Sequence, residues 1–332
     1  MATQKVKLLY VLEFLARESD ENHPINAEKI LAFLEEKGIH CERKSIYSDI
    51  KVLREYGYDI LSTKGNQNGY FLASRTFETV EIQLLADAVE SAKFISPKKT
   101  EQLLQKILLF TSRAHSEEIQ THCHVESSPK AANEEIYYHI DKLSRAIREQ
   151  KKIHVLYRRH KADKANASNF YDKEYTVSPY AMIWSNDCYY LVANYEKYDD
   201  LMVLRIDRIR SMDIVEGESA RHFKEVSEYT EVFDSADYAK KHFNMYAGST
   251  EPVEMICQND VIEQVIDQFG DHIHLYCVDE AHFGMQAEIA VNDGLIAWLL
   301  QFGTRIEVKK PEYLKKLLLK RVTEIQNLYS KV

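Results

Sequence analysis

The segment CERKSIYSDIKVLREYGY, residues 41–58, limits most strongly how this chain can fold. Its apolar residues Ile46, Ile50 and Leu53 recur at the spacing i, i+4 and i+7, which predicts one buried face of an α-helix. Gly57 predicts the end of that helix. The remaining faces carry Arg, Lys and short polar side chains, unlike the Glu/Lys mixture of the preceding helical segment AEKILAFLEEK. This pattern favours a helix that lies along nucleic acid.

The flanking segments predict the domain around this helix. An apolar period from Val6 to Leu15 predicts a first helix, and a second follows Asn26 as N-cap and stops at Gly38. The later segment YDILSTKGNQNGYFLA predicts two short strands joined by a polar turn. Three helices and a hairpin are the layout of a winged helix-turn-helix, whose third helix fits the major groove of duplex DNA.

The candidate DNA-binding residues lie on the third helix and on the wing. Arg and Lys at the start of the helix can reach guanine edges or phosphates, and wing residues can reach the backbone or the minor groove. The alternative is an ordinary three-helix domain whose basic side chains form a solvated face. The predicted set is Arg43, Lys44, Ser45, Tyr47, Ser48, Lys51, Arg54, Lys64 and Asn66.

A formal net charge of -9 does not exclude a polyanionic partner, because the acid is unevenly placed. Residues 1–75 contain 11 basic and 11 acidic residues, whereas residues 217–332 contain 12 and 19. Exposed charges are screened beyond roughly 8 Å at physiological salt. A basic face near the N-terminus can therefore still bind DNA.

Other classes of protein find little support in the sequence. No apolar run approaches the roughly 20 residues of a membrane span, and the charged N-terminal segment does not resemble a signal peptide, so we expect a cytoplasmic protein without membrane contact. The five cysteines form no CxxC pair, and the HCH run at 122–124 is too compact for a preformed tetrahedral metal site. Because catalytic motifs and phosphate-binding glycine loops are missing, we expect no enzyme activity, cofactor or metal.

The N-terminal segment resembles the winged helix of the WYL-domain transcription regulators of bacteria, whose pattern runs roughly R-[RK]-[TS]-I-Y-R-D-I-x-x-L-x-x-x-G-x-x-I. Ser48 stands where that family usually has a second arginine, which implies one phosphate contact fewer. The matching residues are Arg43, Lys44, Ser45, Ile46, Tyr47, Asp49, Ile50, Leu53, Gly57 and Ile60.

Residues 77–133 predict a helical bridge. Two amphipathic helices are broken at Ser96-Pro97, and residues 111–133 lack an apolar period and predict a loop or hinge. The apolar stripes of these helices either pack within one domain or form a dimer contact. A dimer contact would suit a helix-turn-helix that needs two half-sites about 34 Å apart.

Residues 134–217 predict a helix followed by four or five short strands, the pattern of a small antiparallel barrel. This segment resembles the WYL domain, an Sm-like barrel, with the naming triad at Tyr189, Tyr190 and Leu191. The R-x-x-R-I element of that family falls on Arg205, Arg208 and Ile209. The resemblance implies an effector site for a nucleotide or an oligonucleotide.

The candidate effector residues combine arginines with tyrosines. Arginine binds phosphate through a planar fork, and tyrosine rings can stack on bases. The alternative is that Asp207 neutralises a neighbouring arginine and that the tyrosines serve the core. The candidates are Tyr157, Tyr180, Tyr190, Arg205, Arg208 and Arg210.

Residues 218–332 predict the order β-α-β-β-α-β and then a helix, which suggests a ferredoxin-like sandwich. The run WLLQFGTRIEVKKPEYL resembles the extension called WCX that follows WYL domains. The predicted fold class is therefore α+β. The predicted domains are a winged helix-turn-helix (1–76), a helical bridge (77–133), a WYL barrel (134–217) and a WCX-like domain (218–332).

The sequence leaves two functions open. In the first, the chain is a transcriptional regulator that binds a double-stranded operator, as a homodimer, and whose WYL domain senses a nucleotide or oligonucleotide. In the second, it binds RNA or single-stranded nucleic acid through the barrel. The two differ in whether the third helix or the barrel arginines carry the affinity.

Overall fold

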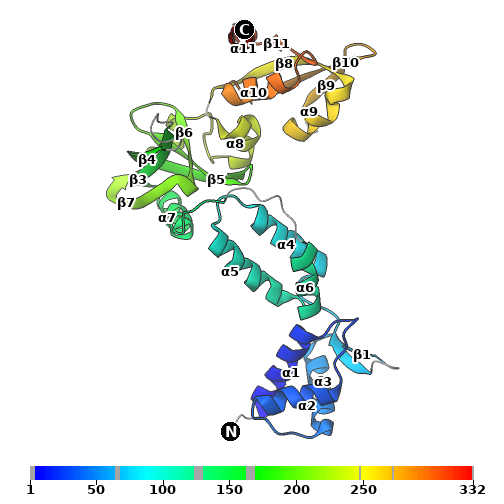
Figure 1. The fold of residues 1–332 in the computed structure, drawn as a ribbon. Helices are drawn as coiled ribbons and strands as arrows, with labels where there is room; N and C mark the ends of the chain where they lie inside the picture. The colour runs from blue at the N-terminus through cyan, green and yellow to red at the C-terminus, as the bar shows by residue number, and fades with distance from the viewer. Residues whose placement is uncertain are drawn as a thin grey trace. The chain divides into compact units, whose positions relative to one another are not determined.

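The computed structural model describes residues 4–63, 68–122, 130–161, 169–246, 248–270 and 273–330. The chain divides into two compact units, residues 1–132 and 133–332, which we describe separately (Figure 1). The predicted α+β class is confirmed, because helices accompany three antiparallel sheets. The finer division into four domains remains a prediction.

The first part of unit 1 contains three helices and a two-stranded sheet. The polar side chain of Asn26 caps the second helix, with its Oδ1 accepting a hydrogen bond from the Lys29 N–H at 2.9 Å. Gly57 ends the third helix at a φ of 118°, as the sequence predicts. The elements are α1 (Gln4–Glu18), α2 (Ala27–Glu36), α3 (Arg43–Tyr56), β1 (Ile60–Thr63) and β2 (Gly69–Leu72).

Ile25 extends this small sheet by one backbone bridge. The N–H groups of Ile25 and Tyr70 each donate to the other residue's carbonyl oxygen at 2.8 Å. Gly69 must remain a glycine here, because a Cβ would lie 2.8–2.9 Å from backbone atoms of Ile25. Beneath the sheet, one core buries Val11, Leu15, Ile30, Leu34, Ile46, Ile50, Leu53 and Ile60.

The second part of unit 1 is a group of helices. The predicted break at Ser96-Pro97 is confirmed, since the Ser96 hydroxyl caps the helix that begins with the proline. The prediction of a loop over residues 111–133 is wrong for Arg113–His122, which are helical. The elements are α4 (Thr79–Ser91), α5 (Pro97–Ile107), the 3-10 turn η1 (Leu108–Phe110) and α6 (Arg113–His122).

Helix α6 escaped the sequence analysis because its stability depends on tertiary packing more than on its own periodicity. Among the side chains of α6 that the structure describes, 113–121, Ile119 alone is buried, in the cluster that Ile82, Ala86 and Leu108 form. The Ser112 hydroxyl accepts a hydrogen bond from the His115 N–H at 3.2 Å, and its own proton goes to Asp20 Oδ2 at 2.7 Å. That second bond ties the start of α6 to the residues that follow α1.

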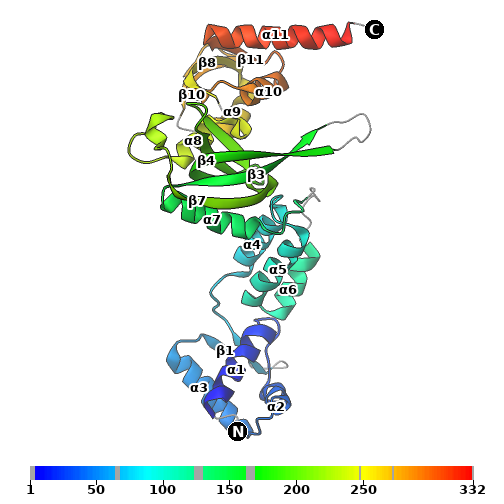
Figure 2. The ribbon, with the colours of Figure 1, turned by 90° about the vertical axis from the view of Figure 1, so that its left-hand side faces the viewer.

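Unit 2 begins with a helix packed on a five-stranded antiparallel sheet of order β6-β5-β4-β3-β7. Figure 2 shows the two long strands β3 and β4 of this sheet. Helix α7 buries Ile136, Leu143 and Ala146. The elements are α7 (Ile136–Arg148), β3 (Lys151–Lys161), β4 (Asn169–Ser185), β5 (Cys188–Tyr195), β6 (Leu201–Arg205), η2 (Ile206–Arg208) and β7 (Ile209–Ser219).

Two features of this sheet depart from the short strands that the sequence predicts. Strands β3 and β4 are long, with β4 beginning at Asn169, which pairs with Lys161. Strands β6 and β7 are separated by the 3-10 turn η2. This turn redirects the chain from β6 at one edge of the sheet to β7 at the other.

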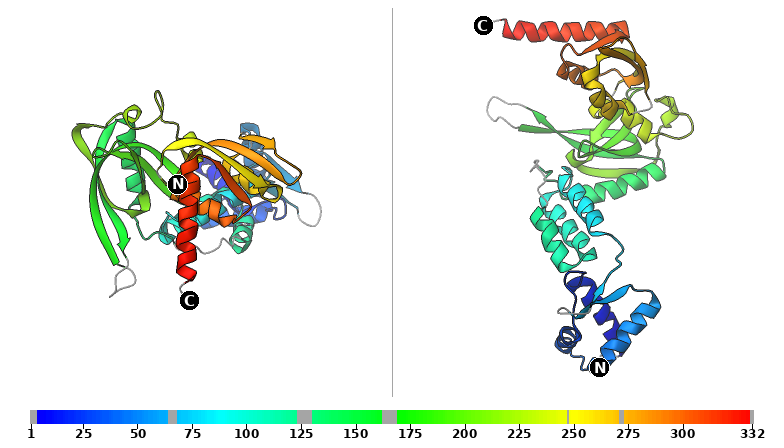
Figure 3. Two further views of the ribbon diagram at one scale, coloured as in Figure 1. Left: turned by 90° about the horizontal axis from the view of Figure 1, so that it is seen from above. Right: turned by 90° about the vertical axis from the view of Figure 1, so that its right-hand side faces the viewer.

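The rest of unit 2 contains a four-stranded sheet of order β11-β8-β10-β9, in which all neighbours are antiparallel. Helices α9 and α10 share its hydrophobic core, and α11 runs beyond the sheet, with its residues from Leu319 to Ser330 exposed (Figure 3). The elements are η3 (Phe223–Glu225), α8 (Ser235–Lys241), η4 (Phe243–Met245), β8 (Thr250–Gln258), η5 (Asn259–Val261), α9 (Ile262–Phe269), β9 (His274–Cys277), β10 (His282–Ala290), α10 (Asp293–Gln301), β11 (Ile306–Lys310) and α11 (Glu312–Tyr329).

Some predictions fall outside the described residues. Lys64 and Asn66 of the predicted wing, and Cys123 and His124 of the HCH run, belong to this group. Within the described parts of the chain, no group of three or more His, Cys, Asp or Glu side chains is placed to hold a metal ion. None of the helices described above is both long and apolar enough to cross a membrane.

Candidate nucleic-acid interface

Helix α3 presents an exposed polar stripe. Lys44, Tyr47, Ser48 and Lys51 are all exposed, and they occupy positions i, i+3, i+4 and i+7 of the helix. Residues at this spacing share one side of an α-helix. No carboxylate in the described part of the chain pairs with Lys44, while Lys51 Nζ lies 3.8 Å from Glu55 Oε1 at an exposed position where such a pair contributes little. Both ammonium groups are therefore available to an anion.

Two arginines flank the stripe and are held in place. The Nε–H of Arg43 donates to the Tyr47 hydroxyl at 2.6 Å, and Glu28 Oε1 lies 3.7 Å from its Nη1. The Nε–H of Arg54 donates to the Ile60 carbonyl at 2.6 Å, and its guanidinium lies 5.9 Å from the centre of the Tyr70 ring. Arg54 thus joins α3 to β1. It therefore has a structural role in addition to its predicted contact with DNA.

Ser45 is the member of the predicted set that the structure turns inward. Its hydroxyl accepts a hydrogen bond from the Lys7 ammonium of α1. Lys7 is 4% exposed, and its Nζ lies 2.8 Å from Asp49 Oδ2 on the next turn of α3. Ser45 is half-buried and its hydroxyl already has a partner in Lys7, so its contact with DNA stays a prediction.

Sequence reasoning missed the Lys7–Asp49 pair, although a signal was present. Lys7, Val11 and Leu15 recur at i, i+4 and i+8, so Lys7 lies on the apolar face of α1. A lysine at such a position requires a buried partner. The partner itself belongs to a different helix, and only the tertiary structure identifies it.

The predicted effector residues lie in unit 2, and the tyrosines serve mainly as packing residues. Tyr157 is 5% exposed, so its ring presents no free face for a base, and this part of the prediction is corrected. Burial raises the pKa of the Tyr157 hydroxyl, while the Arg205 N–H and the Arg208 guanidinium oppose that shift. Tyr190 packs against the cluster that contains Ile183 and Val192, and burial raises its pKa to about 12.

Tyr180 belongs to an aromatic cluster with the segment that follows β7. Its ring stacks on Phe233 at 6.0 Å between centres and meets the edge of Phe223 at 6.2 Å. Its hydroxyl donates to the Arg221 carbonyl at 2.9 Å, and burial raises its pKa to about 12. Tyr180 therefore holds the chain segment that follows β7. Its printed contacts in the described chain include none with Arg205, Arg208 or Arg210.

The three arginines differ in their partners. Arg205 forms two hydrogen bonds with Asp207, Nη2 to Oδ2 at 2.7 Å and Nε to Oδ1 at 3.1 Å, and this contact raises the pKa of its guanidinium. The sequence left open the alternative that Asp207 neutralises a neighbouring arginine, and the structure shows this pairing for Arg205. Arg208 and the exposed Arg210 form no ion pair with the carboxylates that the structure describes.

The turn η2 brings four of the predicted residues together. Tyr190 and Arg205 are paired across β5 and β6, and the Arg205 N–H donates to the Tyr157 hydroxyl at 3.2 Å. Arg208 follows at the end of η2 and approaches the same hydroxyl. The result is a cationic site in which Asp207 neutralises Arg205, while Arg208 contacts the buried Tyr157 hydroxyl and pairs with no described carboxylate.

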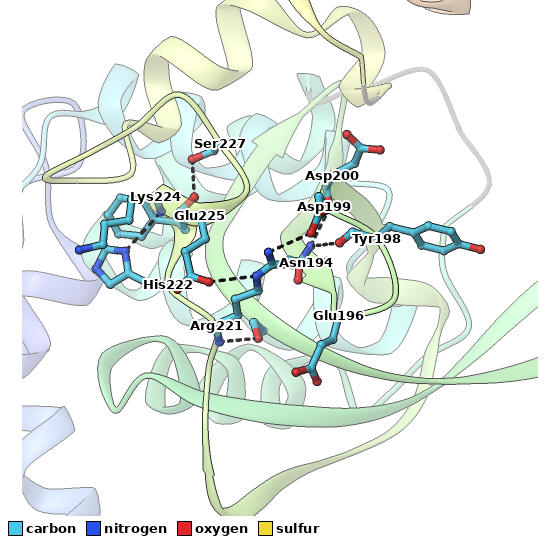
Figure 4. Close-up of polar contacts among 12 residues, drawn as sticks. Asn194, Glu196, Tyr198, Asp199, Asp200, Arg221, His222, Lys224, Glu225 and Ser227 are labelled. Carbon is cyan, nitrogen blue, oxygen red and sulfur yellow. Dashed lines mark hydrogen bonds and ion pairs between the residues drawn. The ribbon is translucent and has the colours of Figure 1, made fainter.

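Arg221 forms a second polar centre in unit 2, which the sequence analysis missed (Figure 4). The Arg221 guanidinium pairs with Asp199 at 2.9 Å and with Glu225 at 3.3 Å. The backbone N–H of Arg221 donates to Ser178 Oγ at 2.8 Å. The buried Asn194 donates through its side-chain amide to the carbonyls of Tyr198 and Asp200. These bonds join the β5–β6 turn to the chain after β7, so the centre is structural, and local spacing in the sequence gave no sign of it.

Comparison with known proteins identifies one part of the chain. Residues 138–214 match the family model described as WYL domain. No curated protein matches the sequence.

The chain is also similar to several solved structures, among them the following two. Proteasome accessory factor B/C (PafBC) of Arthrobacter aurescens shows 14% identity and a TM-score of 0.28, with 95% of this chain and 47% of the PafBC chain covered. This chain thus spans about half the length of that protein. A structure titled as a CRISPR Cas-related protein shows 13% identity and a TM-score of 0.38, with 98% and 84% of the two chains covered.

Proposed function

Because this chain is a WYL-domain protein, we propose that it is a DNA-binding transcriptional regulator whose helix α3 lies in the major groove of duplex DNA. The observation that carries this proposal is the exposed stripe Lys44, Tyr47, Ser48 and Lys51. The buried Lys7–Asp49 pair and the Arg54 bond to β1 hold the stripe on a fixed support. The proposal places the protein in the bacterial cytoplasm, where transcription takes place.

The finer architecture is part of the same proposal. The order of three helices and a hairpin supports a winged helix-turn-helix. The five-stranded antiparallel order β6-β5-β4-β3-β7, in which β7, the last of these strands along the chain, pairs with β3, the first, supports an Sm-like barrel. The order β11-β8-β10-β9, with its split β-α-β unit, supports a ferredoxin-like WCX domain.

We further propose that the protein acts by binding and not by catalysis, with the η2 site as its effector site. Arg208 lies there with no described carboxylate as partner, and its guanidinium contacts the Tyr157 hydroxyl. A nucleotide or an oligonucleotide supplies the phosphate that such a site binds. A homodimer is proposed because a helix-turn-helix regulator reads two half-sites about 34 Å apart.

The first experiment measures the affinity of the full chain for random duplex DNA at several salt concentrations. Each lysine that neutralises a phosphate contributes about 0.9 to the slope of log affinity against log salt. Lys44→Ala and Lys51→Ala should each lower the slope by about this amount, whereas Lys316→Ala on the exposed face of α11 should not. A wild-type slope near zero would refute duplex binding.

Selection of bound duplexes then tests the dimer and the effector. An enriched inverted repeat would support two protomers, and a change in its affinity with added nucleotides or short single strands would support sensing. A clean monomer in sedimentation, with an enriched single half-site, would contradict the homodimer.

The second candidate is a single-strand-binding module. Arg208 and Arg210, which pair with no described carboxylate, favour it. In that case Arg208→Ala should remove most of the affinity for single strands, and Lys44→Ala should remove none. Tight retention of single strands without enrichment of any duplex would decide for this candidate.

A further inference from the structure

Unit 1 contains a pocket of about 750 Å³ that the proposed DNA and effector sites do not use. Its walls come from the end of α1, from α5 with η1, and from α6. Figure 2 shows α5 and α6 side by side in this unit. The volume lies within the 300–1,000 Å³ that small-molecule sites usually have.

The charge of the pocket wall is one-sided. Arg17, Lys106 and Arg113 line it from three different elements, and no Asp or Glu belongs to the lining. Glu18 and Glu117 pair with the two arginines at 3.9 and 3.2 Å from outside the pocket. Lys106 pairs with no carboxylate of the residues described. In a chain of net charge -9, such a wall points to an anionic ligand.

A buried hydroxyl gives an independent indication of a ligand. Thr111 lines the pocket and is 2% exposed, yet its Oγ1 has no hydrogen-bond partner among the described residues. An unpaired buried hydroxyl costs about 1–3 kcal/mol. A rotation of the Thr111 side chain toward the pocket would let a ligand oxygen satisfy it. Its neighbour Ser112 is held by Asp20 at 2.7 Å, so this wall is fixed to the residues after α1.

We propose that this pocket binds a small phosphorylated molecule. The three cations and the Thr111 hydroxyl would bind the phosphate oxygens, since charge-assisted hydrogen bonds are the strongest that proteins form. Leu109, 65% exposed at the pocket wall, offers an apolar surface for the rest of the molecule. Because the lining comes from α1, α5 and α6, the bound molecule joins the N-terminal helices to the helical bridge.

The test is calorimetric titration of the full chain with sodium pyrophosphate and with adenosine monophosphate, in the absence of DNA. We expect saturable binding of at least one probe. Lys106→Gln and Arg113→Gln should each weaken that binding about tenfold or more. Thr111→Val, which keeps the shape of the side chain, should weaken binding without loss of stability. Lys98→Gln, a change of the same charge at an exposed position of α5 outside the pocket, should leave it unchanged.

Four outcomes would overturn the proposal. The first is that neither probe binds saturably. The second is that Lys98→Gln lowers the affinity for the probe as much as the pocket variants do. The third is that only Arg208→Ala lowers this affinity, which would place the phosphate at η2. Weaker duplex binding by Lys106→Gln with unchanged probe binding would also overturn it and assign this wall to DNA. Because the titration uses no DNA, its result is independent of the salt-slope experiment.

Discussion

Lys7 and Asp49 form an ion pair between α1 and α3, with 2.8 Å between Nζ and Oδ2 and with 5% and 14% of their side chains exposed. The pair lies behind the exposed stripe of α3, and Lys7 also donates to the Ser45 hydroxyl. The charge that supports the proposed reading helix is thus separate from the charges that would contact DNA. This separation makes stability and DNA binding independently testable.

Replacement of Lys7 by methionine should destabilise unit 1 by about 3–5 kcal/mol, because Asp49 would remain buried without a partner. Hydrogen exchange of peptides from α1 and α3 measures this loss. The double variant Lys7→Met/Asp49→Leu should recover most of it, since apolar side chains often replace a buried pair without cost. Equal exchange in the single and double variants would show that the pair is not a stability determinant.

Ser45→Ala and Lys44→Ala should separate the two roles of α3. Ser45→Ala should cost about 1.5–3 kcal/mol of stability, because a hydrogen bond to a charged group is lost, and should leave the salt slope unchanged. Lys44→Ala should lower the slope by about 0.9 and change stability by less than about 0.5 kcal/mol. Denaturation and DNA titration of both variants check this, and a lower slope for Ser45→Ala would place Ser45 in the DNA interface.

Asp207→Asn should strengthen anion binding at η2. The Asp207 carboxylate occupies the Arg205 guanidinium through two hydrogen bonds, and its neutralisation would free a second cation beside Arg208. We expect a gain of about fivefold or more in affinity for a labelled single-stranded oligonucleotide, or about 1 kcal/mol. Fluorescence anisotropy measures it, with Arg208→Ala as the matched loss. An unchanged affinity for Asp207→Asn would contradict a role for Arg205 in this site.

Unit 2 should lose stability as the pH falls below about 6.5. His242 is 7% exposed and stacks on Tyr238 at 3.8 Å, and burial lowers the pKa of its imidazole, with Glu228 opposing and Lys241 adding to this shift. Below the unfolded pKa the unfolded chain binds a proton that the folded state resists, so the free energy of unfolding decreases until the folded pKa is reached.

Urea denaturation between pH ~7.5 and ~5.5 measures this dependence. His242→Gln should reduce it, whereas His274→Gln at an exposed position of β9 should not. The nearby Asp237 carboxyl titrates outside this range, because hydrogen bonds with Lys241 and Tyr229 lower its pKa. Identical slopes for wild type and His242→Gln would reject the assignment.

The sequence determined the elements with strong local signals. Periodicity and end signals located α2, α3 and the break before α5, since Asn26, Gly57 and Ser96-Pro97 act on their own backbone. The charge pattern of α3 likewise identified Lys44, Tyr47, Ser48 and Lys51, because exposed side chains of a helix need no distant partner to be recognised.

Tertiary structure decided the features that depend on distant partners. The helix at Arg113–His122 forms because Ile119 enters a cluster from other helices, and Ser45 turns inward because Lys7 reaches it from α1. The physical reason is the same in each case, since burial and charge pairing depend on which residues folding brings within a few ångströms, and sequence spacing does not carry that distance.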